Sequence, residues 1–240
     1  MKDNLSTYTI KESDVRSPFV VESGTKELDN LLGGFKAGEI VFIDGNSDLI
    51  SNMPNQICVN TYRVLRSDIV YVDGGMCANP YQIAKYARKM EMDQREILEH
   101  VHISRAFTVF QMTTILQDML EQIIRRHNPR TLIIGKFPAL YLDSDVSSKE
   151  SQTLLKNNLK KVRELTTKYD LITILSNLDR RMLSNSRNVR KTLYERVDEI
   201  VRMKQMGQCI NVDLVKKHES TIILAFAKGQ LRLEDFGMMI

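Results

Sequence analysis

The sequence predicts an α/β fold with a central, mostly parallel twisted sheet, helices on both faces and an antiparallel extension near the C-terminus. Two observations lead to this prediction. Short apolar runs typical of buried strands alternate with longer helical patterns as far as residue 195, and this alternation is the signature of a mostly parallel sheet. Beyond that residue the pattern changes to short strands joined by turn residues, which indicates an antiparallel meander that extends the same sheet.

The first half of the chain begins this alternation. The residues from Thr25 are expected to form a short amphipathic helix that ends at the glycine pair 33–34. We expect buried strands at 39–44 and 68–73, with a helix from about Pro54 to Arg66 between them. The later elements are expected as helices near 80–90 and 93–99, a strand near 101–104, a helix at 109–126, a strand from 131, a helix at 148–168 and a strand at 171–176.

The last part of the core is expected to be four short strands, at 199–204, 210–217, 221–227 and 230–234. Gly207 and the pairs 218–219 and 228–229 supply the turns between them. We therefore divide the 240 residues into an N-terminal arm, residues 1–20, and one core domain, residues 21–240.

The composition is that of an ordinary globular protein, with 42% hydrophobic and 27% charged residues. A net charge of +4 permits nucleic-acid binding without arguing for it. The sequence shows neither an apolar run long enough to span a membrane nor a signal-peptide pattern, which predicts a cytoplasmic protein. The three cysteines are far apart and odd in number, which argues against a zinc site and against a disulfide framework.

Five segments, spread in order along the chain, together form a specific pattern: SGTKELDNLLGGF (23–35), YVD (71–73), VHISRAF (101–107), IIGKFPALY (133–141) and ILSN (174–177). This ordered set resembles the core of the RecA/RadA recombinases, in their archaeal and eukaryotic branch. The last two segments stand where the Walker B strand and the strand before the family's "TNQ" belong. The resemblance implies a RecA-like core and a RadA paralogue similar to the shorter RadB or RadC proteins.

The resemblance also identifies the loop that corresponds to the family's P-loop. A P-loop needs glycines for close backbone approach, a lysine for the phosphates and a hydroxyl for magnesium. Gly45 is retained here, but Ile50 stands at the second glycine, Ser51 at the lysine and Asn52 at the magnesium hydroxyl. Asp48 adds a negative charge where the phosphates would lie, which is repulsive at short range.

The helix after this loop is expected to make its own N-terminal contacts. Asn52 is a favourable cap and Pro54 suits the first turn. In that arrangement the helix satisfies its own free N–H groups, which are the donors that a phosphate would use. We also expect Asp48 to fill the anion site from within the chain.

Three further positions of the nucleotide site are changed. Gly135, followed by Lys136, replaces the Walker B aspartate, Gly75 replaces the water-activating glutamate, and Leu178 replaces the phosphate-sensing glutamine. Hydrolysis depends on positioning and charge neutralisation by these groups. The sequence therefore predicts a pseudo-ATPase that catalyses no reaction and holds no cofactor or metal, and it disfavours an NTPase with unusual ligands.

Arg105 occupies the position that stacks on adenine in the family. It is either a residual nucleotide contact or a surface arginine packed on a neighbouring helix. Stacking alone contributes about 1–2 kcal/mol, and no phosphate cradle accompanies it here, so the second interpretation is favoured.

The family contacts single-stranded DNA through two loops of the core. The first loop, residues 142–150, is acidic in this chain. The second follows Leu178 and carries five cations with few acids, namely Arg180, Arg181, Arg187, Arg190 and Lys191. We predict phosphate contacts from this second loop, the alternative being a solvated loop. No aromatic residue precedes Tyr194, so base stacking is poorly supported. The basic helix at 148–168 is interpreted as a solvated face.

These sequence features favour two functions over the others. The first is an accessory protein of recombinational repair that binds single-stranded DNA, the active recombinase or both. The second is an interaction scaffold that pairs with another RecA-fold subunit and makes no DNA contact. Residues 7–10 and 19–21 are candidate strands for docking on such a partner, and the oligomeric state stays open. The four histidines, His100, His102, His127 and His218, show no ligand spacing and are interpreted as structural.

Overall fold

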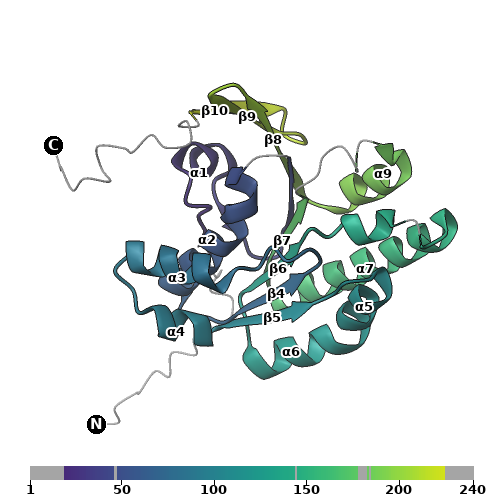
Figure 1. Cartoon of the computed structure of the whole chain (residues 1–240), viewed down its shortest axis with the longest axis horizontal. Coiled ribbons are helices and arrows are strands. Elements are labelled where there is room, and N and C mark those ends of the chain that lie inside the picture. Colours follow the sequence, from purple (N-terminus) through teal and green to yellow (C-terminus); the bar gives the residue numbers. More distant parts are fainter. Residues whose placement is uncertain (1–18, 46–47, 144, 178–182, 184, 225–240) are drawn as a thin grey trace, which may run out of the picture.

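An eight-stranded sheet forms the centre of the computed structural model, which describes residues 19–45, 48–143, 145–177, 183 and 185–224 (Figure 1). The strands from one edge to the other are β10 (Glu219–Leu224), β9 (Cys209–Leu214), β8 (Glu199–Met206), β3 (Ile40–Gly45), β7 (Ile172–Asn177), β6 (Thr131–Gly135), β4 (Ile69–Asp73) and β5 (Val101–Arg105). The six strands from β8 to β5 are parallel. Strands β9 and β10 continue the sheet in antiparallel fashion. The predicted fold class is confirmed.

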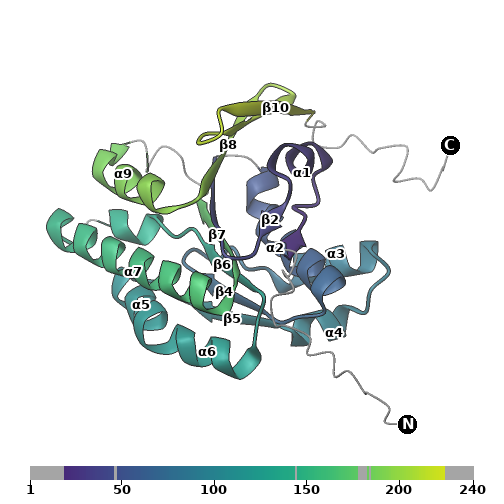
Figure 2. The ribbon, with the colours of Figure 1, turned by 180° about the vertical axis from the view of Figure 1, so that it is seen from behind.

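Helices cover both faces of this sheet (Figures 1 and 2). One face carries α1 (Lys26–Leu32), α2 (Asp48–Leu65), α3 (Pro80–Lys89) and α4 (Gln94–Glu99). The other carries α5 (Val109–Thr114), the π-helix η1 (Ile115–Met119), α6 (Leu120–His127), the 3-10 helix η2 (Ala139–Leu142), α7 (Ser148–Tyr169) and α9 (Arg187–Arg196). None of the helices in the described residues is long and apolar enough to cross a membrane.

The core consists of two apolar clusters, one on each face of the sheet. Alternate residues of β3 divide between them: Val41 and Ile43 belong to one cluster, and Ile40 and Phe42 belong to the other. All four side chains are buried. Successive side chains of a strand point to opposite faces, so a strand buried on both faces has a continuous apolar sequence. This explains why the predicted strands are uninterrupted apolar runs.

Several helices begin where the sequence supplies a capping side chain. Asn79, Asp93, Thr108 and Ser147 each accept a hydrogen bond from a backbone N–H in the first turn of α3, α4, α5 and α7, respectively. Such caps satisfy N–H groups that have no partner within the helix. The observed starts of these helices lie within two residues of the expected ones, because caps are local signals.

The helix expected at 109–126 is interrupted by the π-helix η1. Gln117 of this segment donates through Nε2 to Oδ1 of Asn158, which is fully buried on α7, over 2.9 Å. Nδ2 of Asn158 donates to Oγ1 of Thr113 over 2.9 Å and to the hydroxyl of Tyr141 over 2.8 Å. A satisfied polar network of this kind fixes how the two helices pack. The spacing of apolar residues in the sequence does not by itself reveal this π-helical segment.

The beginning of the described chain is part of the core. Strand β1 (Val20–Val21) pairs in antiparallel fashion with β2 (Phe35–Lys36). The candidate docking strand at 19–21 is therefore already engaged within its own chain, and the boundary expected after residue 20 falls inside this strand. Residues 7–10 and the strand expected at 230–234 lie outside the described residues.

Glu121 on α6 connects that helix to α7. Its carboxylate lies 2.8 Å from Nζ of Lys168 and 3.0 Å from Nζ of Lys161. Nη2 of Arg125 and the hydroxyl of Tyr169 each donate to it over 3.0 Å. Hydrogen bonds from Lys168, then Lys161 and Tyr169, hold the pKa of Glu121 well below its ordinary value. The sequence pattern indicates a solvated face that includes Lys161 and Lys168. Instead, both side chains form ion pairs with Glu121.

We predict that Glu121→Gln lowers the free energy of unfolding at pH 7. A carboxylate with a depressed pKa in the folded state stabilises the fold above its unfolded pKa, and this stabilisation is lost as the pH falls toward the folded pKa. The difference between wild type and variant should therefore narrow as the pH falls below about 4.3. Urea unfolding at pH 7, 5 and 3 measures it, with Glu164→Gln, which removes one exposed ion pair, as the control. A difference that does not change with pH would contradict this assignment.

Candidate functional site at the carboxyl edge of the sheet

The loop that corresponds to the P-loop connects β3 to α2 at the carboxyl edge of the sheet. Ile50 is fully buried there and packs over Gly45. A Cβ atom at residue 45 would overlap both Cδ1 of Ile50 and the carbonyl oxygen of Met203 on β8. Residue 45 must therefore be glycine for close packing, and an apolar side chain occupies the space beside it.

The start of α2 corrects one expectation. The helix begins at Asp48, so Asn52 and Pro54 lie inside it and Asn52 is not its cap. The reason is tertiary packing: Ile50, Met53 and Ile57 recur at helical spacing and are almost completely buried. Their burial outweighs the local preferences of asparagine and proline, although proline removes one helical hydrogen bond.

The remaining loop residues are placed by this helix. Ser51 and Asn52 are half-buried on α2 rather than part of an open loop. The side chain of Asp48 lies outside the described residues, so its expected place in the anion site stays a prediction.

The two positions expected to lack the family's acids are also closed by neighbouring side chains. A Cβ atom at residue 135 would lie 2.9 Å from Cε2 and 3.0 Å from the hydroxyl of Tyr71, which is fully buried. A Cβ atom at residue 75 would overlap Cδ of Lys136. Any side chain at either glycine would force its neighbours to move. Leu178, the third altered position, lies outside the described residues.

Asp73, at the end of β4, organises the loop that follows it. Its buried carboxylate accepts hydrogen bonds from the backbone N–H groups of Gly75, Cys77 and Ala78 over 3.1, 2.9 and 3.1 Å. Nε of Arg105 lies 3.5 Å from Oδ2 of Asp73, and its Nη2 donates to the carbonyl of Ala78 over 3.3 Å. Arg105 therefore supports this loop, and a residual nucleotide contact stays the disfavoured alternative.

A buried polar network joins the three central strands to α9. Asp44 of β3 is 2% exposed and accepts from Nδ2 of Asn177 on β7 and from the hydroxyl of Tyr194 on α9, each over 2.9 Å. Nη2 of Arg202 on β8 lies 3.4 Å from the same hydroxyl. Burial, together with the nearby Asp44 carboxylate, raises the pKa of Tyr194. The sequence did not predict this network, because its members lie far apart in the chain and share no local motif.

Three of the predicted DNA contacts lie on α9, which this network holds in place. Arg187 and Lys191 are exposed and Arg190 is half-buried, while Val189 and Leu193 pack into the core. The cations follow helical spacing and occupy the first half of the helix. Nζ of Lys191 lies 3.8 Å from a carboxylate oxygen of Glu195. Among the described residues this is the one ion pair that these three cations make, and an exposed pair offsets little of their charge.

The rest of the two loops expected to contact DNA is less fully described. Arg180 and Arg181 lie outside the described residues, so the structure places three of the five predicted contacts. In the acidic first loop, Ser147 accepts from the backbone N–H of Glu150 over 3.3 Å and thereby starts α7.

We predict opposite effects for two substitutions at the closed acid position. The hydroxyl of Tyr71 is buried and has no partner among the described residues, so Tyr71→Phe should leave stability unchanged or raise it by up to about 1 kcal/mol. Gly135→Ala should destabilise the fold by about 1–3 kcal/mol through overpacking against Tyr71. Urea unfolding measures both. If Gly135→Asp were as stable as wild type, the position would be open to the family's acid.

Comparisons with known proteins agree with this fold and with the segments identified in the sequence. The chain is 30% identical over 111 residues to DNA repair protein RAD51 homolog 4 from Mus musculus. That alignment covers 43% of this chain and 33% of the relative, so the chain matches about a third of the relative's length. The Rad51 family model matches residues 16–230, which include all the described residues. The resemblance to the RecA/RadA recombinases is thereby confirmed, and the chain belongs to the Rad51 family.

Proposed function

We propose that this Rad51-family chain is a non-catalytic accessory protein of homologous recombination and DNA repair. It binds single-stranded DNA, the active recombinase or both, and it does so without ATP. The repair role rests on membership of the Rad51 family and on the similarity to a protein named for DNA repair. The pseudo-ATPase part rests on the packing at the carboxyl edge of the sheet.

The burial of Ile50 over Gly45 is the observation that carries the non-catalytic part of the proposal. Phosphate binding at a helix N-terminus uses free backbone N–H groups and a close approach of the ligand to the loop. Here the helix starts early and an apolar side chain closes over the glycine. Tyr71 and Lys136 crowd the two acid positions in the same way. Each feature opposes the positioning and charge neutralisation that phosphoryl transfer requires.

We expect ATP with magnesium to produce neither turnover nor a shift in melting temperature. A ligand that binds the folded state raises its apparent stability, so thermal unfolding detects binding as well as hydrolysis. Phosphate release measures turnover in parallel. A concentration-dependent rise in melting temperature would overturn the claim that no nucleotide is held, and phosphate release lost in Ser51→Ala would restore the NTPase alternative.

The DNA-binding part of the proposal rests on α9. Its exposed cations lie on a helix that is anchored to the sheet, so their positions are defined before any ligand arrives. Lysine and arginine contacts to phosphates release counterions, which gives an affinity that falls steeply with salt. The side chain of Tyr194 is committed to Asp44, which leaves backbone contact rather than base stacking as the mode of binding.

We predict that the protein binds labelled single-stranded DNA in a salt-dependent manner that ATP does not affect. Replacing Arg187, Arg190 and Lys191 by alanine should weaken binding and reduce the slope of log K against log salt by about 2, since each single-strand phosphate contact contributes about 0.7. Fluorescence anisotropy over a salt titration measures both quantities.

The matched control removes three exposed cations from α3, Lys85, Arg88 and Lys89, on the other face of the sheet. It changes the net charge equally but should leave most of the salt slope intact. Equal losses in the two variants would show a non-specific charge effect. Absence of binding by the wild type at low salt would remove DNA from the proposal.

A scaffold without DNA contact is the second candidate, and one observation favours it. Four large hydrophobic side chains are more than half exposed in the segments after the neighbouring strands β4 and β5, namely Met76, Tyr81, Phe107 and Phe110. Exposed apolar side chains in a contiguous patch mark sites of protein interaction, and these four follow the carboxyl ends of two paired strands. Another RecA-fold subunit is the partner that this candidate implies.

A further inference from the structure

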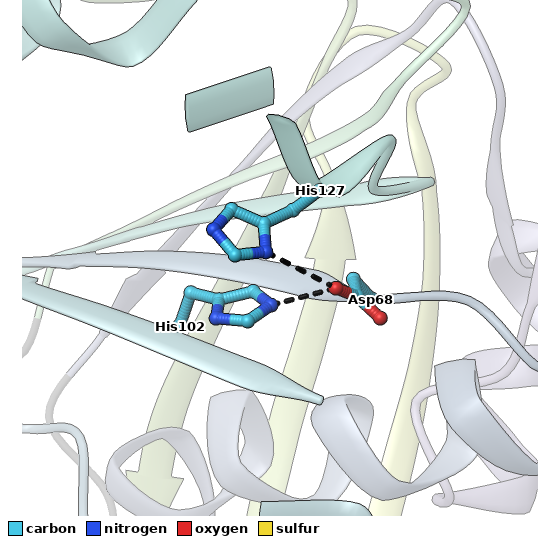
Figure 3. A group of neighbouring side chains, drawn as sticks. All are labelled: Asp68, His102 and His127. Atoms are coloured by element: carbon cyan, nitrogen blue, oxygen red, sulfur yellow. Dashed lines mark hydrogen bonds and ion pairs between the residues drawn. The ribbon is translucent and has the colours of Figure 1, made fainter. Parts of the chain in front are cut away.

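Three potential metal ligands meet at the amino ends of the parallel strands, opposite the carboxyl edge of the sheet. Asp68 directly precedes β4, His102 is the second residue of β5, and His127 ends α6. Figure 3 shows both imidazole rings directed at the carboxylate of Asp68. Nε2 of His102 lies 2.7 Å from Oδ2 of Asp68, and Nδ1 of His127 lies 3.5 Å from the same oxygen.

The sequence interpretation of these histidines as structural rested on the absence of ligand spacing, and the fold brings two of them together with Asp68. No motif joins them, because the cluster is assembled from the starts of two parallel strands and the end of a helix. His127 is the last residue of α6, and Asn128 caps the helix. The left-handed backbone conformation of Asn128 (φ 45°) turns the chain toward β6. The parallel pairing of β4 with β5 sets His102 opposite Val70, close to the start of β4.

The distances suit one small cation. The three ligand atoms lie within 4.8 Å of one another. Zinc bound by histidine nitrogen and carboxylate oxygen at about 2.0–2.2 Å places tetrahedral ligands about 3.4 Å apart. Small side-chain rotations would therefore bring all three atoms onto one ion. Each of the three side chains is only about a fifth to a quarter exposed, so the cluster is held by its surroundings yet open to ions from solvent.

A fourth residue supports the cluster from outside. Nδ1 of His100 lies 2.6 Å from Oδ1 of Asp68, which is the oxygen that His102 and His127 do not contact. The ring of His100 stacks on Tyr62 of α2 with centroids 4.6 Å apart, and the Tyr62 hydroxyl donates to Glu96 over 2.5 Å. Partners of this kind orient ligating carboxylates and are part of functional metal sites.

We propose that Asp68, His102 and His127 bind a divalent transition-metal ion, with zinc as the best-matched example and water in the remaining position. Imidazole with carboxylate is a donor set for zinc and its first-row neighbours rather than for magnesium or calcium. The ion would join the edge strand β5 to β4 and to the end of α6. It acts as a structural clamp on the folded chain, and it is independent of the DNA and nucleotide proposals.

Calorimetric titration of the metal-depleted full-length protein with zinc tests the site. We expect one zinc ion per chain, a zinc-induced rise in melting temperature, and a loss of affinity of more than about tenfold in His102→Gln and in His127→Gln. His100→Gln, which removes the supporting hydrogen bond, should weaken binding by about tenfold. His218→Gln, on an exposed turn away from the cluster, should bind like the wild type.

A second measurement uses only the wild type and so does not depend on the folding of any variant. Histidine modification by diethyl pyrocarbonate, located by mass spectrometry, should be suppressed by zinc at His102 and His127 and unchanged at His218. No zinc binding by the wild type, undiminished binding in both ligand variants, or equal modification with and without zinc would each overturn the proposal.

Discussion

The close packing of β3, β8 and α2 around Gly45 is the constraint on which the carboxyl edge of the sheet depends. The carbonyl of Met203 and the side chain of Ile50 approach residue 45 so closely that no Cβ atom fits. Strand β3 is central in the sheet and pairs in parallel with β7 and β8. The contacts at Gly45 therefore fix the position of the start of α2 relative to the sheet. Burying one isoleucine side chain contributes about 1.5–3 kcal/mol, and that gain favours an early helix start over an open loop.

This packing has a consequence for the surfaces around it. In a phosphate-binding loop, ligand binding itself adds stability to the folded state. On the proposed function the chain lacks that contribution, and the apolar contact of Ile50 stands in its place. The Asp44 network then extends the same rigid region outward, since it ties Asn177 and Tyr194 to β3. The basic first half of α9 is therefore held in a fixed position on the sheet. A surface that is ordered before binding loses less conformational entropy when it binds a ligand.

Local signals account for what the sequence predicts correctly. Continuous apolar runs identify the strands, and capping residues such as Asn79 and Ser147 identify helix starts. The expected start of α2 is wrong because Asn52 and Pro54 are strong local signals that the tertiary burial of Ile50 and Met53 overrides. The family resemblance places Arg187, Arg190 and Lys191 on a loop that contacts DNA; the structure places them on a helix, and their DNA contact stays a prediction. The Asp44 network and the histidine cluster escape such reasoning, because their members meet only when parallel strands align.

The carboxyl and amino ends of the parallel strands thus differ in the interactions that stabilise them. At the carboxyl edge, the packing around Gly45 and the buried Asp44 network hold the strands and α2 together. At the amino ends of β4 and β5, polar side chains converge on one carboxylate. In the part of the chain that the structure describes, β5 is the last strand of the sheet, and an edge strand is the part of a sheet with the fewest partners. A cation shared by Asp68, His102 and His127 would add bonds at this edge, where backbone pairing is one-sided, and its stabilisation would be greatest for β5 and the end of α6.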